Sequence, residues 1–271
     1  MSVTRAIIPV AGWGTRRLPI TKTIEKCMLP IGNRPLVDYV VQDCLKAGIN
    51  DIYFIVGEQS TQLKDYYRSN ISLNDYLRRN GKADKLGLVA PLGGVTLHYI
   101  VQPSYGKYGT AVPIALAAPH INDGESVVVL MGDDFIYNQD GSSEVARLLE
   151  ATPEGSCGLL ATKVPKQDVN KYGVIELDAE GNYVRSIEKP DPEDAPSDLI
   201  NISKYLLTKE VIDLAANVAP APNGEYQLPD AVNQYVANGG QVKVTSAVGQ
   251  YLDGGSVEGW LHANNVVLER S

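Results

Sequence analysis

The first 30 residues combine glycines with basic side chains at a spacing that suits the binding of a polyphosphate. An apolar run over residues 6–10 indicates a buried strand, and it leads directly into Ala11-Gly12-Trp13-Gly14-Thr15-Arg16-Arg17. Glycines let backbone N–H groups approach a ligand closely, and successive amides in such a loop form a concavity that binds anions. Arg16, Lys22 and Lys26 would then surround one polyanion with positive charge. This stretch therefore predicts a triphosphate-binding loop.

Two common phosphate-binding loops do not fit this stretch. A dinucleotide-binding loop has the pattern G-x-G-x-x-G, but Arg17 occupies the position of its third glycine. A P-loop has four residues between its glycines and then Gly-Lys-Ser/Thr, which does not occur at this place. The two glycines alone would fit an ordinary turn between a strand and a helix equally well. The basic residues that follow favour a bound anion.

Composition and charge limit the class of protein. The chain has 271 residues, of which 44% are hydrophobic and 21% charged, enough for one large α/β domain or two small ones. A net charge of −8 argues against nucleic acid as the main partner, whereas a small anionic ligand needs only a local positive pocket. No run approaches the roughly 18 uninterrupted apolar residues of a membrane helix, so no membrane association is expected.

The cysteines indicate a reducing compartment. Cys27, Cys44 and Cys157 are odd in number and widely spaced, so they form neither a disulfide framework nor a zinc site. The first strand begins within a few residues of Met1, which leaves no space for a signal peptide. We therefore expect a cytoplasmic protein.

Hydrophobic periodicity predicts an α/β fold. Apolar residues at helical spacing follow Pro35 and end at Gly48, and residues 51–56 form an apolar strand. Strand, helix and strand within about 50 residues make a βαβ unit, whose right-handed crossover implies a parallel sheet. Residues 95–101 indicate a further strand. The polar segment 60–90 is predicted to be a solvated excursion with two short helices.

The next strand ends in acidic residues. Residues 126–131 form an unbroken apolar run, typical of a strand buried on both faces, and Gly132-Asp133-Asp134 follow it. Ligands of open α/β sheets gather at the carboxyl ends of strands, and Mg²⁺ prefers one or two carboxylates together with phosphate oxygens. A turn or a helix cap would explain the same two acids. Beside a phosphate-binding loop, a magnesium site is favoured.

The second half of the chain has a different pattern. Shorter, alternating strands separated by turn residues are expected over residues 157–164, 174–177, 183–187 and 199–207. They predict a smaller sheet region of mixed direction. Gly173 and the pair Glu188-Lys189 lie at the edges of these expected strands. A strand end that faces solvent is the simplest explanation for a glycine or charged residues there.

Gln102 and the glycine-rich residues after it connect a strand to a helix. An amide side chain both donates and accepts hydrogen bonds, which suits recognition of a base edge. Taken alone, this segment is equally consistent with a plain loop.

The complete pattern resembles the sugar-phosphate nucleotidylyltransferases, whose signature is G-x-G-T-R-x-x-P followed by P-K-x-(M/L)-L-P. These motifs stand here as Gly12-Trp13-Gly14-Thr15-Arg16-Arg17-Leu18-Pro19 and Glu25-Lys26-Cys27-Met28-Leu29-Pro30. Thr21-Lys22 and the Met-Leu-Pro ending are most similar to the bacterial UTP–glucose-1-phosphate uridylyltransferase group. One departure is Glu25, where that group usually has proline.

The resemblance implies roles for individual residues. The site residues that it implies are catalytic Arg16, Lys26 and Lys189; nucleotide-binding Ala11, Gly12, Gly14, Thr15, Gln102 and Gly109; sugar-binding Gly173, Glu188 and Asn201; and the metal ligands Asp133 and Asp253. Two departures concern substrate contacts, because Thr110 replaces a histidine or glutamine and Asn201 replaces a small apolar residue. The second departure indicates a more polar sugar pocket.

The implied fold is a Rossmann-like, doubly wound and mostly parallel sheet that carries a smaller mixed-strand, sugar-binding part. We expect a single domain over residues 1–271, with a nucleotide-binding half (about 1–135) and a sugar-binding half with the C-terminal helix (about 136–271). The implied reaction is Mg²⁺-assisted transfer from UTP to glucose 1-phosphate by a homo-oligomer, a dimer or a tetramer. Two alternatives remain open: the same chemistry with dTTP, CTP or another hexose 1-phosphate, or a non-catalytic nucleotide-sugar sensor.

Overall fold

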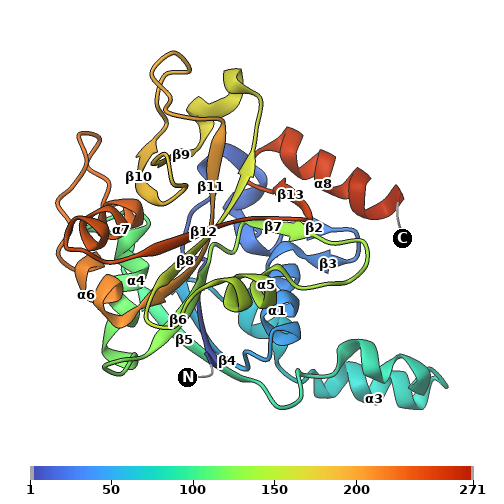
Figure 1. The fold of residues 1–271 in the computed structure, drawn as a ribbon. Coiled ribbons are helices and arrows are strands. Elements are labelled where there is room, and N and C mark those ends of the chain that lie inside the picture. Colours follow the sequence, from blue (N-terminus) through green and yellow to red (C-terminus); the bar gives the residue numbers. More distant parts are fainter. Residues whose placement is uncertain (1–2, 270–271) are drawn as a thin grey trace.

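Four parallel strands form one half of the central sheet in the computed structural model, which describes residues 3–269 (Figure 1). They lie in the order β6-β1-β4-β5 and comprise β1 (Arg5–Pro9), β4 (Asp51–Gly57), β5 (Thr96–Gln102) and β6 (Ser126–Leu130). Their cores are apolar and fully buried apart from the edge strand β5, as expected for parallel strands covered on both faces. Because the strands are parallel, their carboxyl ends meet at one edge of the sheet.

The second half of the sheet is mixed. Strand β11 (Leu199–Thr208) pairs with β6 in antiparallel direction, so the two halves share one continuous sheet. The other strands of this half are β8 (Cys157–Lys163), β9 (Gly173–Leu177), β10 (Tyr183–Glu188) and β12 (Val242–Ser246). The expected α/β fold, a parallel sheet with a smaller mixed part, is therefore confirmed. Strand β12 was not expected from the sequence.

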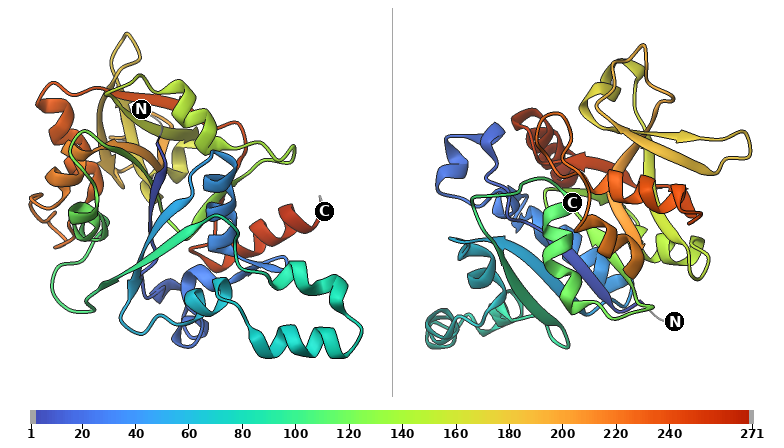
Figure 2. Two further views of the ribbon diagram at one scale, coloured as in Figure 1. Left: turned by 90° about the horizontal axis from the view of Figure 1, so that it is seen from below. Right: turned by 90° about the vertical axis from the view of Figure 1, so that its left-hand side faces the viewer.

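Helices cover both faces of the sheet (Figure 2). Along β1, Ala6 and Ile8 enter one buried cluster and Ile7 enters the other, because successive side chains point to opposite faces. The first cluster lies under α1 (Leu36–Lys46), α5 (Glu144–Ala151) and α8 (Val257–Glu269); the second lies under α4 (Ala111–Ala117), α6 (Lys209–Ala215) and α7 (Leu228–Ala237). Helix α4 is the helix expected after the loop that begins at Gln102, whereas α5 and α6 are additions to the expected elements.

A two-stranded antiparallel ribbon is the feature that the sequence does not reveal. Strand β7 (Asp134–Tyr137) pairs with β13 (Gln250–Asp253), and a short ribbon of β2 (Pro30–Ile31) with β3 (Arg34–Pro35) precedes α1. In the first ribbon the register places Asp253 opposite Asp134. The ribbon therefore joins the end of β6 to a segment about 120 residues later, just before α8.

The polar excursion projects from the main body, with α2 (Gln62–Tyr67) at its base and α3 (Ile71–Arg79) extending away from the sheet (Figure 1). Asn70 caps α3, since its side-chain oxygen accepts a hydrogen bond from the Leu73 amide at 3.0 Å. Both helices of the excursion were expected from the sequence. Within residues 3–269 no helix is both long and apolar enough to cross a lipid bilayer.

Glu144 fixes the segment that leads into β13. This carboxylate is fully buried at the start of α5 and accepts hydrogen bonds from the amides of Val248 and Gly249, at 3.0 and 2.7 Å. Arg147, one turn later, supplies a positive charge 3.3 Å away. The three contacts hold the turn between β12 and β13 and thereby the position of Asp253.

We expect Glu144→Ala to lower the free energy of unfolding by about 2–4 kcal/mol, because two backbone amides and a guanidinium lose their acceptor and the fully buried carboxylate leaves a cavity. Urea denaturation monitored by circular dichroism measures this change. The control is Glu150→Ala on the exposed side of the same helix, which should change stability by less than about 0.5 kcal/mol. Equal effects of the two substitutions would contradict the role given to Glu144.

Candidate active site

The N-terminal loop is shaped by one glycine and leaves the other open. Gly14 has φ 64°, and a Cβ there would lie 2.9 Å from Thr21 Cγ2 and 3.0 Å from Lys26 Cβ. The Thr21 hydroxyl donates a hydrogen bond to the Gly14 carbonyl at 2.8 Å. A Cβ on Gly12 would meet nothing within 4 Å. Gly14 thus sets the fold of the loop, while Gly12 presents accessible backbone to solvent, with Ala11 before it and exposed Thr15 after it.

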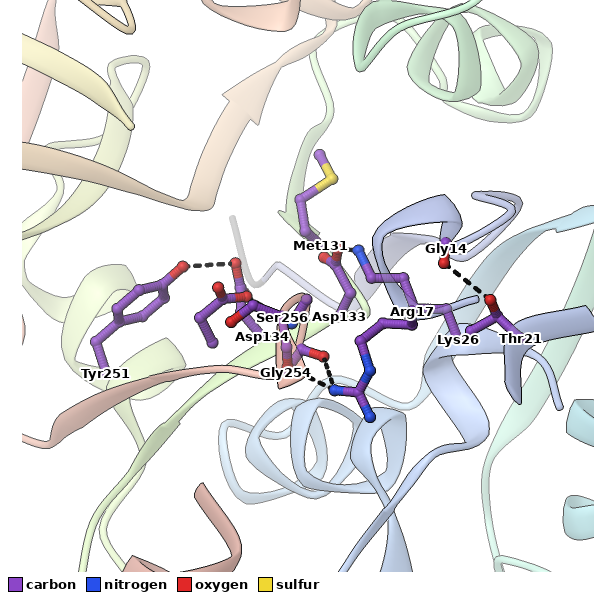
Figure 3. Close-up of polar contacts among 12 residues, drawn as sticks. Gly14, Arg17, Thr21, Lys26, Met131, Asp133, Asp134, Tyr251, Gly254 and Ser256 are labelled. Atoms are coloured by element: carbon purple, nitrogen blue, oxygen red, sulfur yellow. Dashed lines mark hydrogen bonds and ion pairs between the residues drawn. The ribbon is translucent and has the colours of Figure 1, made fainter. Parts of the chain in front are cut away.

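Lys26 reaches from this loop to the end of β6 and forms an ion pair with Asp133 (Figure 3). The lysine side chain is 14% exposed and the aspartate side chain 36% exposed. Burial raises the pKa of the Asp133 carboxyl, but the charges of Lys26, Lys204 and Arg16 outweigh it, so the pKa lies below its usual value. The carboxylate is therefore ionised at neutral pH.

Gly255 marks the point where the charged side chains converge. A Cβ on Gly255 would lie 2.8 Å from Arg16 Nη2 and 3.4 Å from Lys26 Nζ. The same position is 2.8 Å from Asp253 Oδ1, which accepts a hydrogen bond from the Gly255 amide at 2.7 Å. The structure thus brings Arg16, Lys26, Asp133 and Asp253 together from three separate parts of the chain.

Arg17 connects the N-terminal loop to the segment that contains Asp253, a role that sequence reasoning missed. Its guanidinium is 5% exposed and donates to the carbonyls of Gly254 at 3.3 Å and Ser256 at 2.5 Å (Figure 3). It also lies over the Trp260 ring, 5.2 Å from the centroid. Burial lowers the pKa of Arg17, against the raising effect of Asp253 and Glu258. The side chain ties the N-terminal loop to the segment before α8.

A buried lysine supports the acidic segment, and it too was missed. Lys204 on β11 is 3% exposed and pairs with the Asp134 carboxylate, while its ammonium also donates to the Met131 carbonyl at 3.2 Å. The Tyr251 hydroxyl donates to the second Asp134 oxygen at 3.1 Å (Figure 3). Burial raises the pKa of Asp134 to about 6, and Asp133 and Asp253 add to that rise against Lys204. A lysine inside an otherwise apolar strand was the available signal.

The loop expected to read the base is fixed by contacts to the segment before α7. Gly109 has φ 119°, and a Cβ there would lie 2.4 Å from the Tyr226 carbonyl oxygen. Thr110 Oγ1 accepts a hydrogen bond from the Leu228 amide at 2.9 Å, so its hydroxyl is engaged at the start of α7. Gln102 ends β5 beside Gly57, at the carboxyl edge of the parallel strands.

The expected sugar-binding residues share one face of the mixed sheet. Gly173 on β9 pairs with Glu188 on β10 and with Asn201 on β11. A Cβ on Gly173 would lie 3.1 Å from Ser186 Oγ, 3.2 Å from Glu188 Oε2 and 3.7 Å from Asn201 Cβ, so this buried position is crowded and a side chain on residue 173 would press against its neighbours. Lys189 follows with φ 47°, and its ammonium lies 3.3 Å from Glu188 Oε1.

The Asn201 amide is already used within its own strand. Its nitrogen donates to the buried Tyr205 hydroxyl at 2.6 Å, and its oxygen accepts from the Ser203 amide at 2.8 Å. Ser203 has φ 55°, and the pairing of β11 with β8 is irregular between residues 201 and 205. Asn201 therefore stabilises a bulge and faces Gly173 through its Cβ.

The donor set of the site fits a hard divalent cation. Asp133 and Asp253 offer carboxylate oxygens at adjoining strand ends, and Mg²⁺ commonly takes one or two carboxylates and completes its shell with phosphate and water oxygens. Among the described residues, no group of three or more histidine, cysteine, aspartate or glutamate side chains could hold a metal alone. The two carboxylates suit a cation that arrives with a phosphate ligand.

Comparison with known proteins decides the family. The family model described as Nucleotidyl transferase matches residues 5–270. The chain belongs to this family. It is 38% identical over 241 residues to a UTP–glucose-1-phosphate uridylyltransferase of Streptococcus pyogenes, covering 85% of this chain and 78% of that protein. It is 33% identical over 277 residues to the protein of that name from Pseudomonas aeruginosa, covering 98% and 96%.

Solved nucleotidyl transferase structures have the same arrangement. A UTP-bound UGPase from Acinetobacter baumannii superposes with a TM-score of 0.87 at 25% identity, over 98% of this chain and 93% of that one. A UDP-glucose pyrophosphorylase complexed with UDP-glucose gives 0.84 at 28% identity, over 99% and 100%. The resemblance seen in the short motifs therefore extends over the whole fold.

We expect Gly109→Ala to destabilise this nucleotidyl transferase by about 2–4 kcal/mol, because a Cβ would collide with the Tyr226 backbone and strain a positive φ. Gly106→Ala is the matched control, since Gly106 has φ 104° but its Cβ would meet nothing within 4 Å. The difference between the two unfolding free energies isolates the collision. Equal losses would show that the contact with Tyr226 does not fix the loop.

Proposed function

We propose that this nucleotidyl transferase transfers the uridylyl group of UTP to α-D-glucose 1-phosphate and releases UDP-glucose and pyrophosphate. The convergence of Arg16, Lys26 and two carboxylates beside an open glycine loop carries the proposal. With a divalent cation on the two carboxylates, such a set of charges would suit a triphosphate better than a neutral ligand. The names of the relatives, which match over most of both chains, supply the identity of the two substrates.

The phosphates of UTP are assigned to the N-terminal loop. Backbone amides from Ala11 to Thr15, with Gly12 at the open position, would cradle the triphosphate. Arg16 would hold the β- and γ-phosphates that leave as pyrophosphate, and Lys26 would contact the α-phosphate. Gln102 and the backbone at Gly109 lie on the loop that would read the base.

The sugar phosphate is assigned to the mixed sheet. Gly173 would let the hexose approach the backbone of the sheet, Glu188 would accept hydrogen bonds from its hydroxyls, and Lys189 would hold its phosphate. Asn201 lies beside Gly173 on the neighbouring strand. A phosphate oxygen of the sugar then attacks the α-phosphorus in line, and the bond from that phosphorus to the bridging oxygen of pyrophosphate breaks.

No general base is required, since the attacking phosphate oxygen is already ionised at neutral pH. Catalysis then depends on alignment of two anionic substrates and on neutralising the charge that develops at the α-phosphate. Lys26 is the residue placed to stabilise this charge. Asp133 and Asp253 would hold a magnesium ion, which when bound supplies further positive charge to the phosphates.

The decisive measurement is pyrophosphate release with Mg²⁺ and glucose 1-phosphate, using ATP, GTP, CTP, UTP and dTTP in turn. We expect strong preference for UTP, followed by variation of the hexose 1-phosphate. Turnover with dTTP or CTP instead would keep the chemistry and change the substrate. Nucleotide-sugar binding without pyrophosphate release from any pair would favour a sensor.

Substitution of Lys26 tests the assignment of the catalytic lysine. We expect Lys26→Ala to lower kcat about 10²–10³-fold, because one preorganised charge at the transition state is lost. The fold should persist, since Asp133 keeps a partly exposed side chain and the nearby charges of Lys204 and Arg16. Lys46→Ala, at the exposed end of α1, should leave kcat unchanged. Near-normal turnover of Lys26→Ala would refute the assignment.

We also infer that the enzyme acts in the cytoplasm as a homo-oligomer, a dimer or a tetramer, as the resemblance implies. Light scattering on the purified protein measures the mass of the assembly directly. A monomer at micromolar concentration would contradict this part of the proposal.

A further inference from the structure

Glu25, the residue before Lys26, makes an unusually complete set of contacts across the molecule. Its Oε2 accepts a hydrogen bond from the Ser60 hydroxyl at 2.6 Å, and its Oε1 accepts from the amides of Thr61 and Gln62, both at 2.8 Å. The carboxylate therefore receives three donors from one turn. Hydrogen bonds to an ionised acceptor are about twice as strong as those between neutral groups.

The contact is reciprocal. Gln62 Oε1 accepts a hydrogen bond from the Glu25 amide at 2.9 Å, and Gln62 Nε2 donates to the Thr23 carbonyl at 2.9 Å. Thr61 stands at the N-cap of α2 without a capping bond from its own side chain. Glu25 thus satisfies the free amides at the start of α2 from outside that helix, and five hydrogen bonds lock segment 23–25 to segment 60–62.

These five hydrogen bonds also affect the orientation of Lys26, the residue that follows Glu25. The Glu25 carbonyl accepts the Met28 amide at 2.8 Å and so begins the 3₁₀ turn of Lys26–Met28. Cys27, 2% exposed, anchors the inner side of this turn in the core. Because Glu25 fixes one end and Cys27 the other, the Lys26 side chain has a defined direction toward Asp133.

A proline, which the uridylyltransferase group usually has at this point, could not make these contacts. It has no amide hydrogen for Gln62 and no acceptor for the start of α2. The proline ring would restrict the backbone before Lys26 only through its fixed φ. In this chain five hydrogen bonds supply a comparable restriction, and they connect it to the excursion that begins with α2.

We propose that Glu25 is a positioning residue that holds Lys26 for reaction through the turn at the start of α2. This inference rests on the proposed function, because the position of Lys26 matters for catalysis only if the lysine contacts the α-phosphate. The competing explanation is that Glu25 only fastens the excursion to the body of the protein. The two explanations differ in how Glu25 and Lys26 depend on each other.

Glu25→Gln is the primary variant, because the amide keeps the shape but removes the negative charge that strengthens the three hydrogen bonds to residues 60–62. We expect kcat to fall about tenfold with the KM for UTP within about twofold, since small displacements of a catalytic group can cost up to about 10²-fold. Ser60→Ala removes one of the five bonds and should lower kcat about threefold. Unchanged kcat in both variants would overturn the proposal.

A double-mutant cycle with Lys26→Ala separates positioning from fastening. If Glu25 acts through Lys26, Glu25→Gln should change kcat less than twofold once the lysine is absent, because coupled residues are not additive. A tenfold loss in both backgrounds would overturn the proposal in favour of a purely structural role. The cycle uses the full-length protein, and kcat is compared at a temperature at which thermal unfolding shows every variant to be folded.

Hydrogen–deuterium exchange of residues 23–29 provides a readout that does not require turnover. We expect faster exchange in Glu25→Gln and unchanged exchange in the control Asp75→Asn, whose carboxylate pairs with Arg78 on the exposed surface of α3. Unchanged exchange in Glu25→Gln would overturn the proposal. A wild-type protein without pyrophosphate release would instead refute the proposed function, and the exchange result would still decide whether Glu25 orders the segment.

Discussion

The ion pair between Lys26 and Asp133 is the interaction on which the site depends. It joins the N-terminal loop to the end of β6 across 107 residues of sequence. An ionised carboxylate in this environment is costly by itself, and the lowered pKa of Asp133 exists only because Lys26, Lys204 and Arg16 offset the effect of burial. Each charge is therefore stabilised by a fold that brings the others to it, and two of the cations that stabilise the aspartate, Lys26 and Arg16, are the ones proposed to bind the triphosphate.

The C-terminal part of the chain completes this arrangement with backbone contacts. Arg17 crosses from the N-terminal loop to the carbonyls of Gly254 and Ser256, and the pairing of β7 with β13 holds Asp253 opposite Asp134. Carbonyl oxygens suit a buried guanidinium because they accept hydrogen bonds from its Nη1 without adding a net negative charge next to the carboxylates. The position of Asp253 is thus set by the fold of residues 250–256.

Sequence reasoning succeeded where the position of an element or residue follows from local pattern and failed where it follows from pairing between distant segments. The apolar runs located the four parallel strands, and the glycines, Lys26 and Asp133 were found by their place after strands. The ribbon of β7 and β13 was missed, because two four-residue strands show no periodicity until they are paired. Arg17 was missed for a related reason, since its acceptors lie 237 and 239 residues away.

The two lysines near the acidic segment differ in how many buried acceptors they hold, and this difference supports a structural role for one and the proposed catalytic role for the other. Lys204 is 3% exposed and donates to the Asp134 carboxylate and to the carbonyls of Met131 and Asp134, so moving it would leave several buried acceptors unpaired. Within residues 3–269, Lys26 has a single hydrogen-bond acceptor, the Asp133 carboxylate, which is itself 36% exposed. An incoming phosphate can therefore reach the ammonium, while Gly14 and Glu25 keep the lysine backbone in place. A fixed backbone with an exchangeable ammonium group is what transfer of a charged phosphate requires.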